Sequence, residues 1–164
     1  MMGSETATAR EARLPAWVER VVRWARVKSP WVLHHNTGGC NGCDIELLDL
    51  LTPRYDVERL GIKQAYSPRH ADVLLCTGPV TRQSRDRLLR IYEQIPAPKW
   101  VVAVGSCACS GGIFQGAPSV MGGVDQVIPV DVYLPGCPCR PESMMDGLLR
   151  LLASLEGKGG NDEG

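Results

Sequence analysis

The sequence predicts an α/β domain of three layers, in which a mostly parallel sheet is covered by helices on both faces. Short runs rich in valine and leucine, such as "DVLLC" and "KWVVAVG", alternate along the chain with longer amphipathic segments. These runs are apolar throughout, which is typical of strands buried on both faces of a parallel sheet. The chain has 164 residues, of which 44% are hydrophobic and 22% charged, a size that suits one such domain.

An amphipathic helix is predicted at residues 14–28, "LPAWVERVVRWARVK", near the start of the chain. The helical period places Trp17, Val21 and Trp24 on one face. That face could cover the core of the domain or dock on another subunit, and the sequence leaves both options open.

The α/β domain itself is predicted at residues 29–156, between two small, polar and flexible ends, 1–13 and 157–164. The β-prone run "WVLHHN" comes first, and the helix "DIELLDLL" follows and stops before Pro53. The strand "DVLLCTG" is followed by the helix "VTRQSRDRLLRIYEQI". Two more strands, "KWVVAVG" and "VDVYLPG", precede the helix "ESMMDGLLRLLASL". We expect a flavodoxin-like arrangement of these elements.

The seven cysteines are expected at one edge of this sheet. Each lies at or just after the end of a predicted strand: Cys40, Cys43, Cys76, Cys107, Cys109, Cys137 and Cys139. Loops converge at the carboxyl ends of parallel strands, and ligands bind there. The start of the chain lacks the apolar segment of a secretory signal, which predicts a cytoplasmic protein with reduced thiols. Clustered cysteines in odd number then favour a metal site or catalysis over disulfides.

Four thiolates from separate loops can hold either a tetrahedral zinc ion or a 4Fe-4S cluster. Only Cys40 and Cys43 have the C-x-x-C spacing of a zinc knuckle, whereas the other candidates form C-x-C pairs, from which one sulfur each is the easier geometry. Glycines beside the cysteines let the main chain approach a negatively charged cluster. Cys43 also begins a predicted helix, whose dipole stabilises a thiolate. These features favour a cluster, and a zinc-stabilised binding module is the alternative.

Four motifs in order resemble those of a known family: "NTGGCNGCDIE", "TGPVT", "VGSCACSGGIF" and "GVDQVIPVDVYLPGCPCRPES". They are similar to the small subunit of energy-converting, membrane-bound (group 4) nickel-iron hydrogenases and to its relative, the 20 kDa subunit of NADH-quinone oxidoreductase, or complex I. The resemblance spans most of residues 31–152. It implies one 4Fe-4S cluster, bound by Cys40, Cys43, Cys107 and Cys137. Residue 139 is a cysteine here, where the family usually has proline.

The resemblance also implies an activity and partners. The cluster would relay electrons to or from the nickel-iron centre of a hydrogenase large subunit, which interconverts protons and hydrogen. A ferredoxin-like 4Fe-4S subunit and integral membrane subunits complete the expected complex, which would make this chain peripheral on the inner face of the cell membrane. The chain ends soon after the last ligand helix, so we expect a single cluster and no activity of the chain alone.

The alternative within the family is a complex I type subunit that passes electrons to quinone. That branch has adjacent cysteines at the first ligand pair. The two residues between Cys40 and Cys43 therefore favour the hydrogenase branch.

Glu46 lies three positions after Cys43, one helical turn along the same face. Its carboxylate could couple proton movement to electron movement, or it could only cap and solvate its helix.

Several other functions are excluded by composition and motif. Eighteen basic and eighteen acidic residues cancel, and no basic patch with aromatic residues suggests nucleic-acid binding. The segment "GSCACSGG" lacks the lysine of a phosphate-binding loop, which argues against a nucleotide. The longest central apolar run, residues 100–104, is far shorter than the roughly 20 residues that span a bilayer.

Overall fold

The computed structural model describes residues 15–157. The predictions of flexible ends at 1–13 and 157–164 fall outside this part of the chain, except at Gly157, which ends the last helix.

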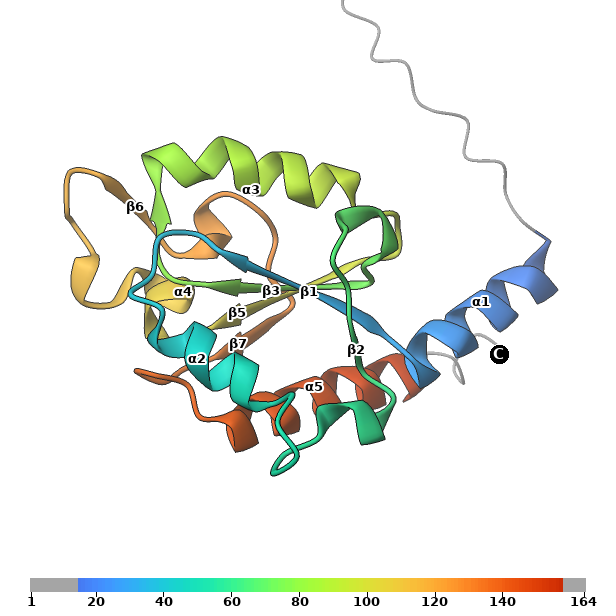
Figure 1. Ribbon diagram of the computed structural model, residues 1–164. Coiled ribbons are helices and arrows are strands. Elements are labelled where there is room, and N and C mark those ends of the chain that lie inside the picture. Colours follow the sequence, from blue (N-terminus) through green and yellow to red (C-terminus); the bar gives the residue numbers. More distant parts are fainter. Residues whose placement is uncertain (1–14, 158–164) are drawn as a thin grey trace, which may run out of the picture.

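A five-stranded parallel sheet forms the centre of the domain (Figure 1). Its strands are β1 (Trp31–Asn36), β2 (Lys63–Gln64), β3 (Val73–Thr77), β5 (Trp100–Val104) and β7 (Val132–Leu134). The spatial order is β2-β1-β3-β5-β7, and all four pairings are parallel. This is the flavodoxin-like order, so the predicted fold class is confirmed.

Helices cover both faces of the sheet. The α-helices in residues 15–157 are α1 (Ala16–Lys28), α2 (Gly42–Asp49), α3 (Arg82–Gln94), α4 (Ser106–Ser110) and α5 (Pro141–Gly157). In Figure 1, α3 lies over one face, and α2 and α5 lie over the other. Leu75 of β3 packs in the core beneath α2 and α5, whereas Leu74 and Cys76 pack in the core beneath α3. Burial on both faces explains why this strand is apolar throughout.

Shorter elements connect the main ones and were not predicted, because two to four residues carry too little periodic signal. Strand β4 (Val80–Thr81) pairs antiparallel with β6 (Val120–Gly122). The 3₁₀ turns are η1 (Val57–Leu60), η2 (Pro68–His70), η3 (Gly112–Phe114) and η4 (Val124–Gln126).

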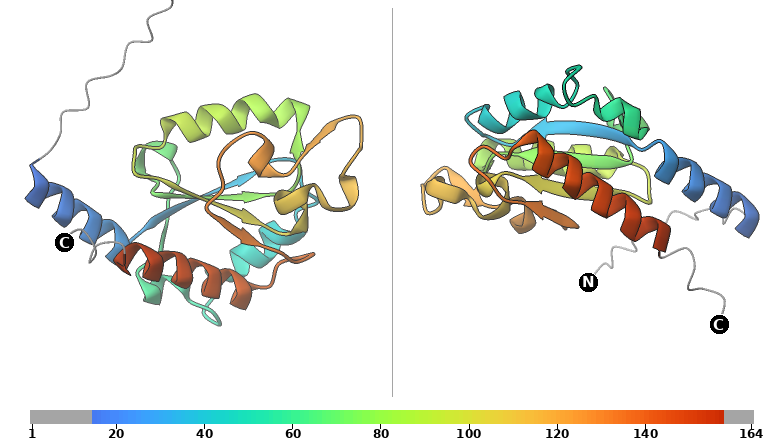
Figure 2. Two further views of the ribbon diagram at one scale, coloured as in Figure 1. Left: turned by 180° about the vertical axis from the view of Figure 1, so that it is seen from behind. Right: turned by 90° about the horizontal axis from the view of Figure 1, so that it is seen from below.

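Helix α1 projects from one end of the domain (Figures 1 and 2). Its side chains Trp17, Val21 and Trp24 are 69%, 56% and 64% exposed. The option in which this face covers the core of the domain is therefore wrong. The helix is held near its C-terminal end, where Val27 is buried and Arg26 Nε lies 3.2 Å from a carboxylate oxygen of Asp72.

Two neighbouring leucines on α5 test the layered packing. Leu148 is 3% exposed and packs beneath the sheet, whereas Leu149 is 43% exposed. We expect Leu148→Ala to lower the free energy of unfolding by about 3 kcal/mol, because it removes buried methyl groups and leaves a cavity. Leu149→Ala should cost less than about 1 kcal/mol. Urea unfolding followed by circular dichroism measures both, and equal losses would contradict the packing described.

Candidate functional site

A cavity of about 80 Å³ lies at the carboxyl edge of the sheet. Its wall is built by the loops that follow β1, β3, β5 and β7, and it includes Cys40, Cys43, Cys107 and Cys137. The strand order reverses between β1 and β3, and ligands of open α/β sheets bind at such a point. The structure thus brings together the four cysteines that the resemblance had selected.

The other three cysteines do not line this cavity. Cys76 lies within β3, where burial raises the pKa of its thiol to about 12. Cys109 donates its thiol hydrogen to the Ala103 carbonyl oxygen at 3.6 Å. Cys139 is 1% exposed and packs in the core beneath α2 and α5. In each C-x-C pair, therefore, the first cysteine lines the cavity, and the second packs against one of the two hydrophobic cores.

Two glycines leave room for the sulfur atoms of this site. A Cβ atom at Gly105 would lie 2.5 Å from Cys43 Sγ, and one at Gly112 would lie 3.0 Å from Cys107 Sγ. Both glycines also have positive φ, +87° and +53°, which side chains disfavour. The main chain therefore approaches the sulfurs at positions that only glycine tolerates well.

The thiols of the cavity influence one another. Burial raises the pKa of Cys107, and the neighbouring Cys137, Cys43 and Cys40 raise it further. Burial also raises the pKa of Cys43, although a hydrogen bond from the Cys139 backbone N–H opposes the shift. Four thiolates without a cation would repel one another here, so binding of a metal group would release protons.

Within residues 15–157, no three Cys, His, Asp or Glu side chains are placed to hold a single metal ion. The four thiols instead stand around the cavity, whose wall also includes Gly39, Gly78 and Gly136. Four thiols are the donor set of an iron–sulfur cluster, and the glycines leave room for the backbone to reach one.

Asp44 is a member of this site that the sequence did not indicate. It follows Cys43 in the first turn of α2 and lines the cavity. Its Oδ1 accepts a hydrogen bond from the Thr77 hydroxyl and lies 3.1 Å from His34 Nε2, and its Oδ2 accepts from the Asn36 side-chain amide. An acidic residue at a helix start was visible in the sequence, but its partners lie on two different strands, His34 and Asn36 on β1 and Thr77 on β3.

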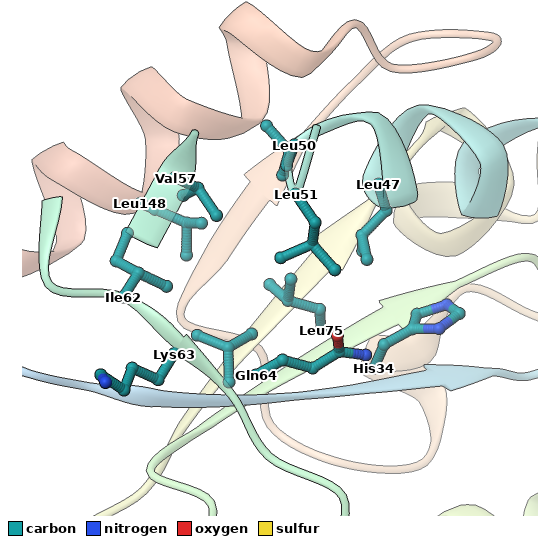
Figure 3. A pocket seen from close by; sticks show the side chains of 11 residues that line it. His34, Leu47, Leu50, Leu51, Val57, Ile62, Lys63, Gln64, Leu75 and Leu148 are labelled. Carbon is teal, nitrogen blue, oxygen red and sulfur yellow. The ribbon is translucent and has the colours of Figure 1, made fainter. Parts of the chain in front are cut away.

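The adjacent histidines of β1 point to opposite faces of the sheet. His34 also lines a smaller cavity of about 30 Å³ in the apolar core. Figure 3 shows Leu47 of α2, Leu51 just beyond the end of that helix, and the His34 ring of β1 around this space. His35 lies toward α3, where burial lowers its pKa, and its Nε2 has no hydrogen-bond partner among residues 15–157.

The four cysteines lie within the segment 40–151, which matches the family described as the 20 kDa subunit of NADH ubiquinone oxidoreductase. The chain belongs to this family. The predicted relationship is therefore confirmed at the level of the family.

Several known proteins resemble this chain over most of its length. The probable membrane-bound hydrogenase subunit mbhJ of Pyrococcus furiosus is 54% identical over 128 residues, which cover 78% of this chain and 77% of the relative. An NADH-quinone oxidoreductase subunit of Heliobacterium modesticaldum is 45% identical over 140 residues, which cover 85% and 78%. A chain of the membrane-bound sulfane sulfur reductase, an archaeal respiratory membrane complex, is 44% identical with a TM-score of 0.75, covering 89% of this chain and 80% of that one.

Glu46 lies on α2, three residues after Cys43. It is half-buried and does not line the cavity. Burial raises the pKa of Cys139 to about 11, with Cys43, Cys109 and Glu46 adding to the shift. The Glu46 charge thus acts weakly on the second cysteine of a C-x-C pair, and the role of Glu46 in proton movement stays a prediction.

A pair of glycine variants tests the close approach of the main chain to sulfur. Gly105→Ala should displace Cys43 and lower the iron bound per chain severalfold, because the new methyl group overlaps Sγ. Gly116 has a similar φ of +85° but no atom within 4 Å of an added Cβ. Gly116→Ala should therefore keep the iron content of the wild type. Equal iron loss in both variants would mean that backbone strain, and not the sulfur contact, decides the result.

Proposed function

We propose that this chain is an electron-transfer subunit that holds one 4Fe-4S cluster through Cys40, Cys43, Cys107 and Cys137. The observation that carries the proposal is the convergence of these thiols, from loops after three different strands, on one cavity. Four cysteine thiolates hold such clusters, which supply one-electron oxidation and reduction when bound. Relatives named as hydrogenase and NADH-quinone oxidoreductase subunits support a redox role.

The glycines of the cavity wall favour a cluster over a single zinc ion. Gly39, Gly78 and Gly136 share this wall with the four cysteines and bring the main chain close to them. Backbone N–H groups at such positions can donate to the sulfurs of a cluster and tune its potential.

One side of the site lies at the surface. Cys40 and Cys137 are exposed, whereas Cys43 and Cys107 are partly buried. Electron tunnelling weakens steeply with distance, so a redox partner must dock close to this side. We assign that place to a hydrogenase large subunit with a nickel-iron centre. A ferredoxin-like 4Fe-4S subunit and integral membrane subunits complete the proposed complex.

The hydrogenase complex is preferred to a quinone-linked one for two reasons. Cys40 and Cys43 have the C-x-x-C spacing of the hydrogenase branch, and identity to the hydrogenase relative is 54% against 45% for the quinone-linked one. A structural relative is named as a sulfane sulfur reductase, so sulfane sulfur must be among the substrates tested.

We further propose that residues 29–156 act as the cluster-binding unit and that residues 14–28 dock it onto a partner. The exposed apolar face of α1 supports this second role. None of the helices in the part of the chain that the structure describes is long and apolar enough to cross a bilayer. Two of the relatives are named as parts of membrane-bound complexes, which supports peripheral attachment at the inner face of the cell membrane.

Purification of the chain with its native partners tests the proposal. We expect about four iron and four acid-labile sulfide per chain, nickel in a large subunit, and hydrogen uptake. Stoichiometric zinc without sulfide would contradict the cluster. Iron and sulfide without nickel, together with reduction of quinone or sulfane sulfur, would keep the relay and replace the hydrogenase partner.

Two cysteines of one C-x-C pair test the ligand assignment. Cys107 lines the cavity, whereas Cys109 contacts the Ala103 carbonyl group. We expect Cys107→Ser to abolish or convert the EPR signal of the reduced cluster and Cys109→Ser to spare it. The reverse result would show that the second sulfur of the pair is the ligand.

A further inference from the structure

Asn36 and Asp44 connect three parts of the site, although neither is a candidate ligand. Asn36 ends β1, and Asp44 lies in the first turn of α2. Between them runs the short loop that carries Cys40. Their side chains meet directly, because the Asn36 amide donates to the Asp44 carboxylate.

The Asn36 side chain uses its full capacity for hydrogen bonds. Its Oδ1 accepts from the backbone N–H groups of Gly38 and Gly39, both at 2.8 Å. Its Nδ2 donates to Asn41 Oδ1 at 3.1 Å and to Asp44. A carboxamide has two acceptor positions and two donor hydrogens, and all four are occupied within this loop and the first turn of α2.

The Asp44 carboxylate fixes the other side of the same arrangement. Oδ2 is held by Asn36, and Oδ1 is held by the Thr77 hydroxyl at the end of β3. His34 Nε2 lies 3.1 Å from the same Oδ1 and 3.0 Å from Thr77 Oγ1. Asp44 therefore joins the ends of two neighbouring strands to the start of α2.

The loop has few other means of fixing its shape. Gly38 and Gly39 have no side chains, and Cys40 and Asn41 are exposed. Its first residue is anchored, because the buried Thr37 hydroxyl donates to the Gly78 carbonyl oxygen at 2.7 Å. Beyond Thr37, the side-chain bonds to the loop in the structure come from Asn36.

We propose that Asn36 and Asp44 form a clamp that positions Cys40 relative to Cys43 and that places a negative charge on the wall of the cluster cavity. This inference rests on the proposed function, because it assumes a cluster at this site. A carboxylate so near the cluster opposes the addition of an electron. The clamp therefore has two measurable effects: it slows loss of the cluster, and it lowers the reduction potential.

The charge is tested by a matched pair of variants in the purified native complex. Asp44→Asn and Asp49→Asn each remove one carboxylate from α2, but Asp49 does not line the cavity. In a potentiometric titration followed by EPR, Asp44→Asn should shift the cluster to a more positive potential, and Asp49→Asn should stay near the wild type. Equal shifts, or no shift for Asp44→Asn, would overturn this part of the inference.

The positioning role is tested by exchanging the two side chains. Asn36→Asp sets two carboxylates against each other, so iron release to a chelator should become faster by about tenfold or more. The double variant Asn36→Asp with Asp44→Asn restores a donor opposite an acceptor and keeps the two backbone N–H groups of Gly38 and Gly39 satisfied. Its release rate should return toward that of the wild type, and a double variant no slower than Asn36→Asp would overturn the clamp.

The wild-type complex separates this inference from the function on which it rests. A wild-type complex without iron and without an EPR signal would overturn the proposed function, and the clamp with it, before any variant is compared. If Asn36→Asp does not assemble, the comparison of Asp44→Asn with Asp49→Asn still decides on the charge, and the release rate of Asp44→Ala, which removes both acceptor oxygens of the clamp, decides on the clamp. A rate equal to that of Asp49→Ala would overturn it.

Discussion

The site depends on the parallel register of the sheet, which makes four loops end side by side. The register continues beyond the strands as hydrogen bonds between the loops. The Gly105 N–H donates to the Leu134 carbonyl oxygen at 2.7 Å, and the Ser106 N–H donates to that of Gly136 at 2.8 Å. The loops of Cys107 and Cys137 are thus bonded to each other directly. Backbone hydrogen bonds thus set the spacing of the two segments that carry these sulfurs.

Different parts of the site are positioned by different means, some by the backbone and one by a side chain. Gly105 and Gly112 admit the sulfurs of Cys43 and Cys107 at close range, at the cost of conformational entropy on folding. The loop of Cys40 is held differently, by the side chain of Asn36. Under the proposed function, such contacts suit electron transfer. If the atoms around the cluster move little when its charge changes, the reorganisation energy of electron transfer is small.

The alternation of strands and helices in the sequence was sufficient to predict four of the five strands and the edge that carries the site, whereas the two-residue strand β2 was not predicted. Spacing alone left zinc and a cluster open, and the choice of Cys107 over Cys109 relied on family resemblance. The connection between Asn36 and Asp44 could not be predicted, because it requires the left-handed turn at Asn41, with φ of 66°, and the neighbouring end of β3. Side-chain contacts across strands depend on this three-dimensional arrangement. The exposure of Trp17 could not be predicted for a similar reason. The helical period shows which face of the helix is apolar, but it does not show what covers that face.

The position of β7 in the sheet has a consequence for assembly. This strand pairs with β5 late in the sequence, and Cys137 follows it. The candidate ligands come together only when β7 has joined the sheet, so the donor set is incomplete until Cys137 has been added to the chain. Under the proposed function, all four ligands can hold a cluster only after that step, and the exposed Cys40 and Cys137 mark the side on which it would enter. The surface that a redox partner later covers would first serve as the entrance for maturation, so the order of the two events is fixed.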